Sequence, residues 1–410
     1  MSFLNRWFQN NVVLIIEKKN TMLNNGMDHR IIIAGDLFPS GKNIPLFEEG
    51  RVEEIFGKRI VELFRDADFS LFNLEGPLTS SNNRQEKTGP VLKASEKCVE
   101  GIKGLGVSAV MLANNHITDY QNDGFTDTIK VLDEKGIRYI GAGENKDCIE
   151  KYLSIEIGKR KVCIYNVSEV FYNRATATSP GANLYDEYVV CNDIKDLKKT
   201  HDYLIVVYHG GTEEFPYATP LLRQHFHRMV DCGADFITAQ HTHCIGCSEN
   251  YKGTYLLYGQ GNFLFARMKK EVTKHGLVTE IVFSDNDVNI IQHAVKVSND
   301  DVVRYDESQD LAAFYARGAE LCDFEAVQKK YLKFCYNEEI IKDRFLNSFR
   351  GDSFYYRMIK RLFSSYYNKH ILEKYEKVQL MRIAKCMESE RYAENMFACV
   401  QYMMENNKLP

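Results

Sequence analysis

The hydrophobic pattern of this 410-residue chain predicts short buried strands that alternate with amphipathic helices from about residue 30 onward. Short apolar runs that end at glycine or polar residues are typical of strands buried on both faces. These runs span residues 31–34, 69–72, 109–112, 137–140, 203–208, 235–240 and 254–258. Apolar positions at helical spacing predict helices over residues 52–67, 98–105, 122–136 and 219–232. This alternation indicates an α/β fold with parallel strands.

Two further segments predict β-hairpins, which are consistent with a second sheet. The first hairpin covers residues 152–167 and turns at Gly158-Lys159, and the second covers residues 276–297 and turns at Asp285-Asn286-Asp287. Residues 80–95 and 172–186 are polar and predict loops, and we expect the loop at 80–95 to lie over the site described below.

Changes in composition divide the chain into three predicted parts. Residues 1–29 show no regular pattern and predict a loosely ordered leader. Residues 30–300 hold all the predicted strands and form the main domain. Residues 310–410 contain no proline before Pro410 and repeat aromatic, Met, Lys and Glu residues at helical spacing, which predicts a helical C-terminal appendage.

The overall composition indicates a soluble globular protein, with 44% apolar residues, 26% charged residues and a net charge of −4. Nothing in it is basic enough to suggest binding to nucleic acid. The eleven cysteines are odd in number and irregularly spaced, which is typical of reduced thiols in a cytoplasm. The apolar run at residues 12–16 is too short for a membrane span or a signal peptide. We therefore expect a cytoplasmic protein without a membrane span.

Most of the predicted strands end at residues that can bind a metal or transfer a proton. Carboxylates, imidazoles and one amide form a ligand set of oxygen and nitrogen that suits Mn, Zn, Fe or Ni. The set is too large for one tetrahedral ion and suits two divalent ions that share a carboxylate, as in metal-assisted phosphoryl displacement. Its members are Asp36, Glu75, Asn115, His116, His209, His241 and His243.

Each of these residues also has a purely structural explanation. An aspartate after a glycine at a strand end, as in Gly35-Asp36, is often a turn or cap residue. The pair in His241-Thr-His243 points more strongly to a metal, because residues two apart in extended geometry lie on the same side. Cys244-Ile-Gly-Cys247 follows closely, so a mononuclear zinc site with His241, or a redox pair, is an alternative. That alternative leaves the earlier carboxylates unused.

Six motifs stand in an order that resembles the capsule-synthesis (poly-γ-glutamate) CapA-like family, a branch of the calcineurin-like metallophosphoesterases. The resemblance covers about residues 30–298 and leaves the helical tail outside. The motifs are Gly35-Asp36, Asn73-Leu-Glu75, Ala113-Asn-Asn-His-Ile-Thr-Asp119, His209-Gly-Gly-Thr-Glu213, Gly233-Ala-Asp235 with His241-Thr-His243, and Gly261-Asn262-Phe263.

The resemblance implies a four-layer α-β-β-α sandwich of two mixed sheets with a dinuclear site at the strand ends. In this arrangement Asp36 and His243 hold one metal, and Glu75 bridges to the second. The ligands of the second metal are Asn115, His209 and His241.

The resemblance also implies roles in proton transfer. His116 would be the general acid that protonates the leaving oxygen, and Asp119 would orient its ring. Glu213 matches the acidic residue that follows the family's His-x-Gly.

These observations together predict a dinuclear metal-dependent hydrolase in which a metal-bound hydroxide attacks a phosphate ester. The substrate would be a phosphorylated small molecule or a polyanionic polymer. One alternative is an accessory protein of capsular polymer assembly that binds a polyanionic chain or a capsule-assembly partner protein. Another is an amide hydrolase for γ-glutamyl links, because a metal-activated water also attacks carbonyl groups.

Overall fold

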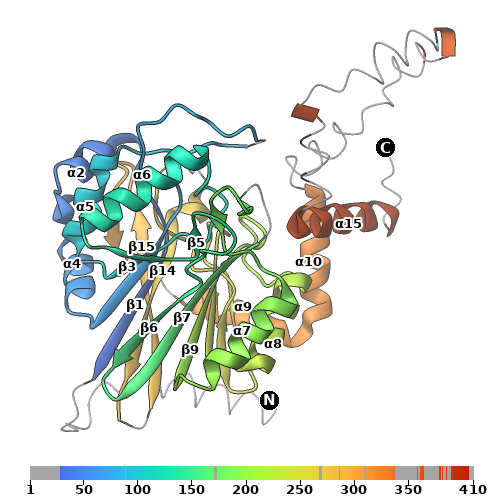
Figure 1. Ribbon diagram of the computed structural model, residues 1–410. Helices are drawn as coiled ribbons and strands as arrows, with labels where there is room; N and C mark the ends of the chain where they lie inside the picture. Colours follow the sequence, from blue (N-terminus) through green and yellow to red (C-terminus); the bar gives the residue numbers. More distant parts are fainter. Residues whose placement is uncertain are drawn as a thin grey trace.

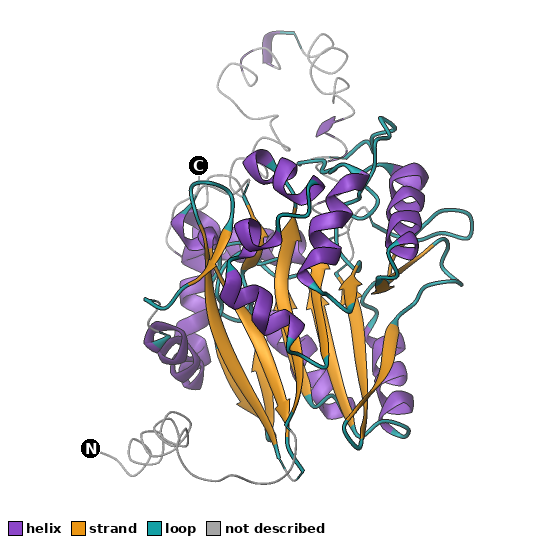
Figure 2. Cartoon of the chain, turned by 90° about the vertical axis from the view of Figure 1, so that its left-hand side faces the viewer, coloured by secondary structure: helices purple, strands orange, loops and turns teal. Residues whose placement is uncertain are grey.

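The computed structural model describes residues 28–87, 89–169, 173–266, 270–285, 287–308, 311–337 and 389–405, with a few isolated positions between 358 and 385. Two mixed sheets lie face to face, and helices cover the outer face of each (Figures 1 and 2). This is the four-layer α-β-β-α arrangement that the resemblance implied. The predicted leader lies almost entirely outside the described residues.

The first sheet is built around β1, which pairs in parallel with β2 and β13 and antiparallel with β14. Its strand order is β16-β15-β14-β1-β2-β3-β4, and α2 to α6 cover its outer face. The strands are β1 (His29–Phe38), β2 (Phe69–Leu74), β3 (Ala109–Met111), β4 (Arg138–Ile140), β13 (Asn262–Phe265), β14 (His275–Phe283), β15 (Val288–Val297) and β16 (Val303–Tyr305). The helices are α2 (Ile44–Glu48), α3 (Val52–Phe56), α4 (Lys58–Arg65), α5 (Val99–Leu105) and α6 (Gln121–Glu134).

The second sheet has the order β11-β12-β10-β9-β7-β6, with α7 and α8 on its outer face. Its strands are β6 (Tyr152–Ile157), β7 (Arg160–Ser168), β9 (Tyr203–His209), β10 (Phe236–Gln240), β11 (Ser248–Tyr251) and β12 (Thr254–Leu257). The helices are α7 (Glu187–Lys198) and α8 (Pro220–Cys232). A short pair, β5 (Ala142–Gly143) with β8 (Gly181–Ala182), lies beside the sandwich.

Successive side chains of the central strands pack against different layers, because they point to opposite faces of the sheet. Ile31 and Ile33 of β1 pack between the sheets with Ile205 and Val207 of β9. Their neighbours on β1, such as Ile32, pack instead against the helices of the first outer layer. Both faces of these strands are therefore dry, which explains their uninterrupted apolar sequence.

Several predicted boundaries required correction. The single helix predicted over residues 52–67 is two helices, because Gly57 adopts a φ of +74° that no α-helix accommodates. Helix α7 was not predicted, although Asp186 caps it by accepting the N–H of Val189 at 3.0 Å. The predicted loop at 172–186 contains β8 in its described part. The predicted hairpin turn at Gly158-Lys159 is confirmed.

The described C-terminal residues are helical, in α9 (Ala312–Glu320), α10 (Phe324–Asn337) and α15 (Glu390–Glu405). They pack on the sandwich: Phe314 of α9 joins a cluster with Leu257 and Leu277, and α15 crosses α10 in direct contact with it (Figure 1). The Arg317 guanidinium donates to the carbonyl of Gly246 at 2.8 Å. Within the described ranges, none of the helices combines the length and apolar character needed to cross a bilayer.

Candidate metal centre

The predicted metal ligands meet at one rim, where the ends of β1, β2, β3, β9 and β10 come together. All six are buried, with relative exposures between 0% and 6%. The backbone of the rim is tight: a Cβ atom on Gly35 would lie 2.1 Å from the carbonyl oxygen of Gly261, so glycine is needed where β1 passes the turn before β13. The six residues are Asp36, Glu75, Asn115, His209, His241 and His243.

Five of these side chains form two groups that share one carboxylate. Glu75 lies with His209 and His241 in one group, and with Asp36 and His243 in the other. Within each group, one potential ligand atom per residue lies within 4.8 Å of the others. Two groups of potential cation ligands therefore adjoin each other, with Glu75 between them.

The distances between potential ligand atoms within each group fit a shared cation better than they fit direct hydrogen bonds. Glu75 Oε1 lies 3.7 Å from His209 Nε2 and 3.9 Å from His243 Nε2. Both separations are too long for hydrogen bonds. Two ligand atoms bound to the same tetrahedral ion at about 2.1 Å lie about 3.4 Å apart, close to these values.

Glu75 provides the clearest test of whether a cation fits. Its side chain has 0% exposure, and neither of its oxygens accepts a hydrogen bond from the residues that the structure describes. Burial, followed by the nearby charges of Asp36 and Glu213, raises the pKa of Glu75 well above its usual value. A buried carboxylate without a partner is costly, and a bound cation removes that cost. The residues present therefore fit a cation at Glu75.

Asp36 is held by donors on both of its oxygens. Asn73 Nδ2 donates to Oδ1 at 2.8 Å, and the backbone N–H of His241 donates to Oδ2 at 2.9 Å. Asn114 in turn donates to Asn73 Oδ1 at 3.0 Å. Burial raises the pKa of Asp36, while the charge of His243 and these hydrogen bonds oppose the rise. The carboxylate orientation is thus set by two neighbouring strand ends.

Asn115 joins the group around His209. Asn115 Oδ1 lies 2.9 Å from His209 Nε2, so the predicted amide and imidazole ligands face each other. The His209 and His241 rings have centroids 4.9 Å apart. Parallel pairing of β9 with β10, which places His209 beside Gln240, explains this proximity.

The two histidines of His241-Thr-His243 reach the rim by a different backbone from the one predicted. Their φ angles are +82° and +52°, in the left-handed region and not in the extended conformation. Few residues other than glycine occupy this region, and such conformations cluster at functional sites. The rings still converge, with centroids 5.8 Å apart, but through a strained turn that the sequence did not indicate.

His116 and Asp119 lie beside this centre in direct contact. His116 Nδ1 is 2.6 Å from Asp119 Oδ2, and a turn connects the two residues through the bond from Asp119 N–H to the His116 carbonyl at 3.0 Å. Burial and the charge of Lys87 lower the pKa of His116 to about 4. Lys87, in the loop predicted to cover the site, was not among the predicted site residues, and no sequence signal distinguished it from Lys93, the other lysine of that loop.

Glu213 and Glu169 flank the same imidazole. Glu213 Oε1 lies 3.7 Å from His241 Nε2, and its side chain is 46% exposed, so it links the buried ligands to solvent. Glu169 Oε1 lies 3.8 Å from the same nitrogen and is buried. Sequence reasoning missed Glu169, although it directly follows strand β7, a position that the strand-end argument covers.

Asn262 was part of a recognised motif but had no predicted role. Its Nδ2 donates to the carbonyl of Thr273 at 2.7 Å, so its Oδ1 faces His243 Nδ1 at 2.7 Å. An amide oxygen only accepts, and therefore the hydrogen of the His243 ring sits on Nδ1. The lone pair of His243 Nε2 is then directed to the side of Glu75, which is the arrangement that metal-binding histidines need.

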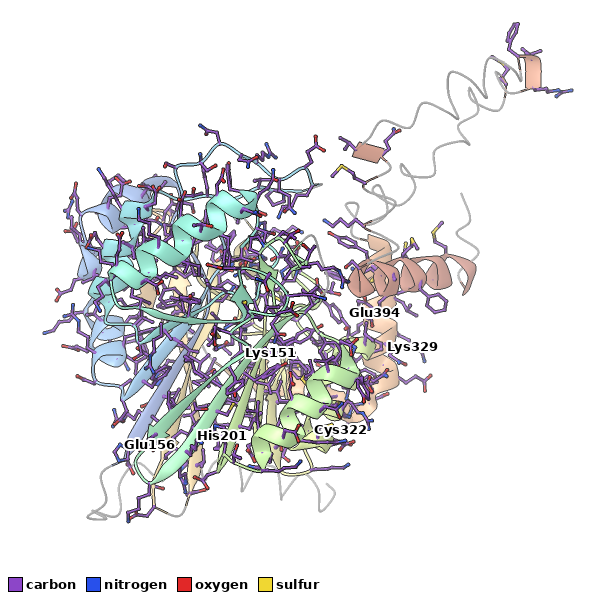
Figure 3. All side chains as sticks on the ribbon, in the orientation of Figure 1. Lys151, Glu156, His201, Cys322, Lys329 and Glu394 are labelled. Carbon is purple, nitrogen blue, oxygen red and sulfur yellow. The ribbon has the colours of Figure 1, made fainter. Side chains whose placement is uncertain are left out.

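The C-terminal helices α10 and α15 contact the loop that follows His209. Thr212 Oγ1 donates to Asn395 Oδ1 at 3.1 Å, and the Tyr331 hydroxyl donates to the same oxygen. Phe215 packs on Tyr331 with ring centroids 5.1 Å apart. Glu394, labelled on α15 in Figure 3, accepts the N–H of Leu221 at 3.0 Å. Helices α10 and α15 therefore hold the segment that carries Glu213.

The cysteine alternative is not supported. Cys244 and Cys247 are buried, and burial raises the pKa of both thiols to about 12. Both are therefore neutral thiols as long as no metal is bound. Among the described residues, the groups able to hold a metal contain no cysteine, and the described cysteines are free thiols.

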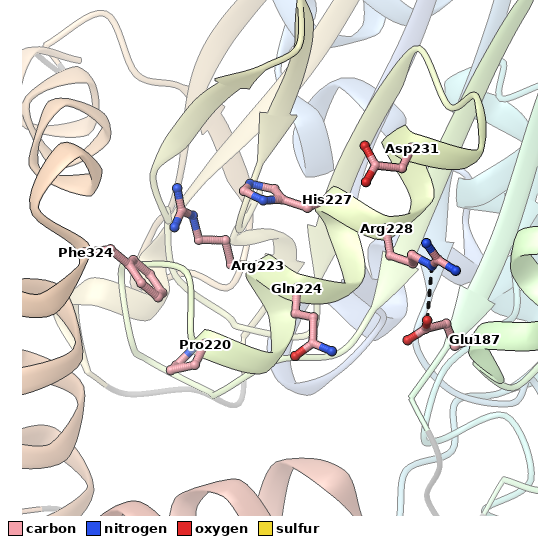
Figure 4. A pocket seen from close by; sticks show the side chains of 8 residues that line it. All are labelled: Glu187, Pro220, Arg223, Gln224, His227, Arg228, Asp231 and Phe324. Carbon is pink, nitrogen blue, oxygen red and sulfur yellow. Dashed lines mark hydrogen bonds and ion pairs between the residues drawn. The ribbon is translucent and has the colours of Figure 1, made fainter.

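A surface pocket of ≈ 380 Å³ beside α8 is lined by side chains that link neighbouring helices (Figure 4). Arg228 Nε donates to Glu187 at 3.1 Å, linking α8 to α7. Arg223 donates to Glu249 and lies 4.4 Å from the centre of the Phe324 ring, linking α8 to the start of α10. These side chains stabilise the junction of the helices.

The family of bacterial capsule synthesis proteins (PGA_cap) has a model that matches residues 30–267, more than half of the chain. The chain belongs to this family. The capsule biosynthesis protein CapA of Bacillus anthracis is 32% identical over 217 residues, covering 51% of this chain and 53% of that protein. The PGA biosynthesis protein CapA of Bacillus subtilis (strain 168) is 27% identical over 236 residues, covering 57% and 62%. This chain thus spans less than two thirds of the length of either relative.

Similarity extends to another bacterial protein and to solved structures. A protein of Mycobacterium tuberculosis (strain H37Rv) named as a probable polyglutamine synthesis accessory protein is 28% identical over 209 residues, covering 48% of this chain and 55% of that protein. Among solved structures, a novel phosphatase from Mycoplasma pneumoniae is 16% identical with a TM-score of 0.41, covering 70% of this chain and 99% of that one. A 5'-nucleotidase precursor from Thermus thermophilus is 13% identical with a TM-score of 0.37, covering 65% and 54%.

Proposed function

We propose that this protein is a metal-dependent hydrolase of phosphate esters that uses two divalent cations. The observation that carries the proposal is Glu75, a fully buried carboxylate without a hydrogen-bond partner among the described residues, shared by two groups of potential ligands. Asp36, Glu75 and His243 would hold one cation. The residues for the second would be Glu75, Asn115, His209 and His241. Mn, Zn, Fe and Ni all suit these donors.

The bound cations would supply Lewis acidity and acidify a coordinated water. Side chains of the protein would transfer the proton and contact the substrate. Water adds to phosphorus, the bond from phosphorus to the leaving oxygen breaks, and His116 passes the proton that the leaving oxygen needs. Its low pKa leaves the free ring neutral, and an anionic phosphate group bound nearby would raise that pKa and let the ring carry the proton. Glu213, half exposed beside His241, would contact the incoming substrate.

The test combines metal analysis with hydrolysis assays on wild type and Glu75→Gln. Wild-type protein loaded with Mn or Zn should retain about two equivalents after desalting and hydrolyse 4-nitrophenyl phosphate or its diester. Glu75→Gln should lose metal and activity together. Glu62→Gln, on the exposed side of α4, is the matched control and should change neither. Full activity in metal-free protein, or in metal-free Glu75→Gln, would overturn the proposal.

A second candidate function rests on the names of the relatives. Proteins named for capsule or PGA biosynthesis and for a probable accessory role in polyglutamine synthesis are similar to this chain over about half its length. An accessory protein would bind a polyanionic polymer or a partner protein without fast turnover. Metal-loaded protein that cleaves neither phosphate esters nor γ-glutamyl amides, yet binds poly-γ-glutamate in a direct binding assay, would favour this function.

A further inference from the structure

Lys87 is buried next to the candidate proton donor. Its side chain is only 1% exposed, whereas lysine is almost never fully buried unless it is paired. The ammonium donates to Asp119 Oδ1 and to the backbone carbonyl of Asn115 at 3.1 Å. Lys87 therefore contacts both the carboxylate partner of His116 and the backbone of a candidate metal ligand.

The loop that carries Lys87 is anchored on Asp119 at two further points. The N–H of Gln85 donates to the Asp119 carbonyl at 2.8 Å, and the N–H of Leu92 donates to Asp119 Oδ2 at 2.6 Å. Asp119 is itself fully buried, with 0% exposure. One loop thus supplies three donors to one aspartate, and Lys87 is the only charged donor among these three.

These donors constrain the hydrogen on the His116 ring. His116 Nδ1 lies 2.6 Å from Asp119 Oδ2 and 3.3 Å from Lys87 Nζ. An ionised carboxylate only accepts hydrogen bonds, so the shorter and stronger of the two contacts places the hydrogen on Nδ1. The Lys87 ammonium donates to the other oxygen of Asp119 and so fixes the carboxylate with Oδ2 toward the ring. Nε2 is then the ring atom left to exchange a proton. A carboxylate that fixes an imidazole tautomer in this way strongly affects catalysis.

We propose that Lys87 is a positioning residue that acts through Asp119 to keep the hydrogen of the His116 ring on Nδ1 and to present Nε2 for proton transfer. The kinetic consequence rests on the proposed phosphoester hydrolysis, whereas the tautomer of the ring does not. Without Lys87, Asp119 Oδ1 loses its charged donor, and the carboxylate is free to turn away from His116 Nδ1. The hydrogen of the ring is then no longer held on Nδ1 and can move to Nε2, and the orientation of the ring loses its support.

The kinetic experiment compares two esters that differ in the leaving group. Departure of 4-nitrophenolate needs little help from a proton, whereas an alkyl oxygen such as that of glycerol phosphate must be protonated. In Lys87→Met, kcat for the alkyl ester should fall by about 10²-fold or more, the scale of general acid catalysis, with a much smaller fall for the aryl ester. His116→Ala should show the same pattern. The double variant should be little worse than either single variant, because residues acting through one another are not additive.

Lys93→Met is the matched control. Lys93 belongs to the same loop, but its ammonium donates to the Ser81 carbonyl at 2.6 Å and to Asn82 Oδ1 at 3.0 Å instead of to Asp119. Its replacement should leave the ratio of alkyl to aryl rates unchanged. An equal loss of both rates with lost metal in Lys87→Met would mean a structural role for Lys87, and an unchanged ratio would mean no role in proton transfer. Either result overturns the inference.

A measurement on the ring itself keeps the inference testable whether or not the protein cleaves esters. Histidine side chains labelled with ¹⁵N report their tautomer by NMR, and loss of one signal in His116→Gln assigns the ring. Wild type should show hydrogen on Nδ1, and Lys87→Met or Asp119→Asn should shift it toward Nε2. Hydrogen on Nε2 in wild-type protein would refute the inference directly. Failure of wild type to cleave either ester would refute only the proposed function.

Discussion

The contact between Asn262 and His243 makes a specific prediction about metal affinity. Asn262 is fully buried, and its two side-chain bonds, to His243 Nδ1 and to the Thr273 carbonyl, are both 2.7 Å long. Asn262→Leu keeps a similar volume and removes both bonds. The His243 ring is then free to turn and to place its hydrogen on Nε2, where it blocks a cation.

The expected magnitude follows from the position of the contact. Removing the hydrogen-bond partner of a metal-binding histidine typically weakens affinity by about 10- to 100-fold. That corresponds to about 1.4–2.7 kcal/mol. The loss should fall on the site formed by Asp36, Glu75 and His243. The site that includes His209 and His241 should change little, so one of the two equivalents should be lost first.

The assay is a metal titration followed by calorimetry, with thermal unfolding measured in the absence and presence of metal. Metal-free Asn262→Leu also loses stability, because the Thr273 carbonyl is left without its donor, at a cost of about 1–3 kcal/mol. Asn43→Leu is the matched control, since Asn43 is buried, donates to the Asp301 carbonyl at 2.8 Å and lies outside the metal centre. Both variants should be destabilised without metal. Only Asn262→Leu should gain less stability from added metal, and an equal gain in the two variants would refute the reasoning.

Three further predictions concern stability and the contact between the C-terminal helices and the loop that follows His209. Phe263 stacks between Phe56 and Phe64 at centroid distances of 5.5 and 5.3 Å, so Phe263→Ala should lower the unfolding free energy by about 3–5 kcal/mol in urea titrations, and a cost below about 1 kcal/mol would contradict this packing. The hydrogen bond from His293 lowers the pKa of Glu280, so the stability that Glu280 contributes is present above the usual glutamate pKa and is lost as pH falls through the lowered value. The stability difference between wild type and Glu280→Gln should therefore shrink on acidification from pH 6 toward pH 3, and a constant difference would rule out this linkage. Asn395→Leu removes the acceptor that holds Thr212, and should lower kcat/KM several-fold while metal content stays unchanged; a loss of metal instead would show that the helices support the centre rather than the loop.

Much of the architecture could be predicted because it depends on local pattern. The runs in β1 and β9 are apolar at every position since both faces are buried, and that signal needs no knowledge of the partner strands. The cap at Thr219 and the left-handed Gly233 likewise set the ends of α8 from local chemistry alone. Helix α7 had comparable signals, with an aspartate cap and buried residues at helical spacing, and could have been predicted from them.

The residues of the candidate site likewise divide into those that local pattern could predict and those that it could not. Residues that end a strand could be predicted as neighbours, because the carboxyl ends of parallel strands share an edge. Lys87 could not, since it lies on a loop whose path depends on contacts with Asp119 that are distant in sequence. The left-handed backbone at His241 and His243 was also unpredicted, because that strain is supported by surrounding structure and not by local preference.

By itself, the sequence determined which segments are strands and helices and which residue types stand where the strands end, because hydrophobic periodicity and capping are local properties. Only the tertiary structure decided that Glu75 lies between two groups of imidazoles and carboxylates without a hydrogen-bond partner among the described residues. It also decided that Lys87 is buried against Asp119 and that α15 holds the loop of Glu213. Burial and charge compensation depend on side chains from distant parts of the chain, so they arise only when the sheets and helices have packed together.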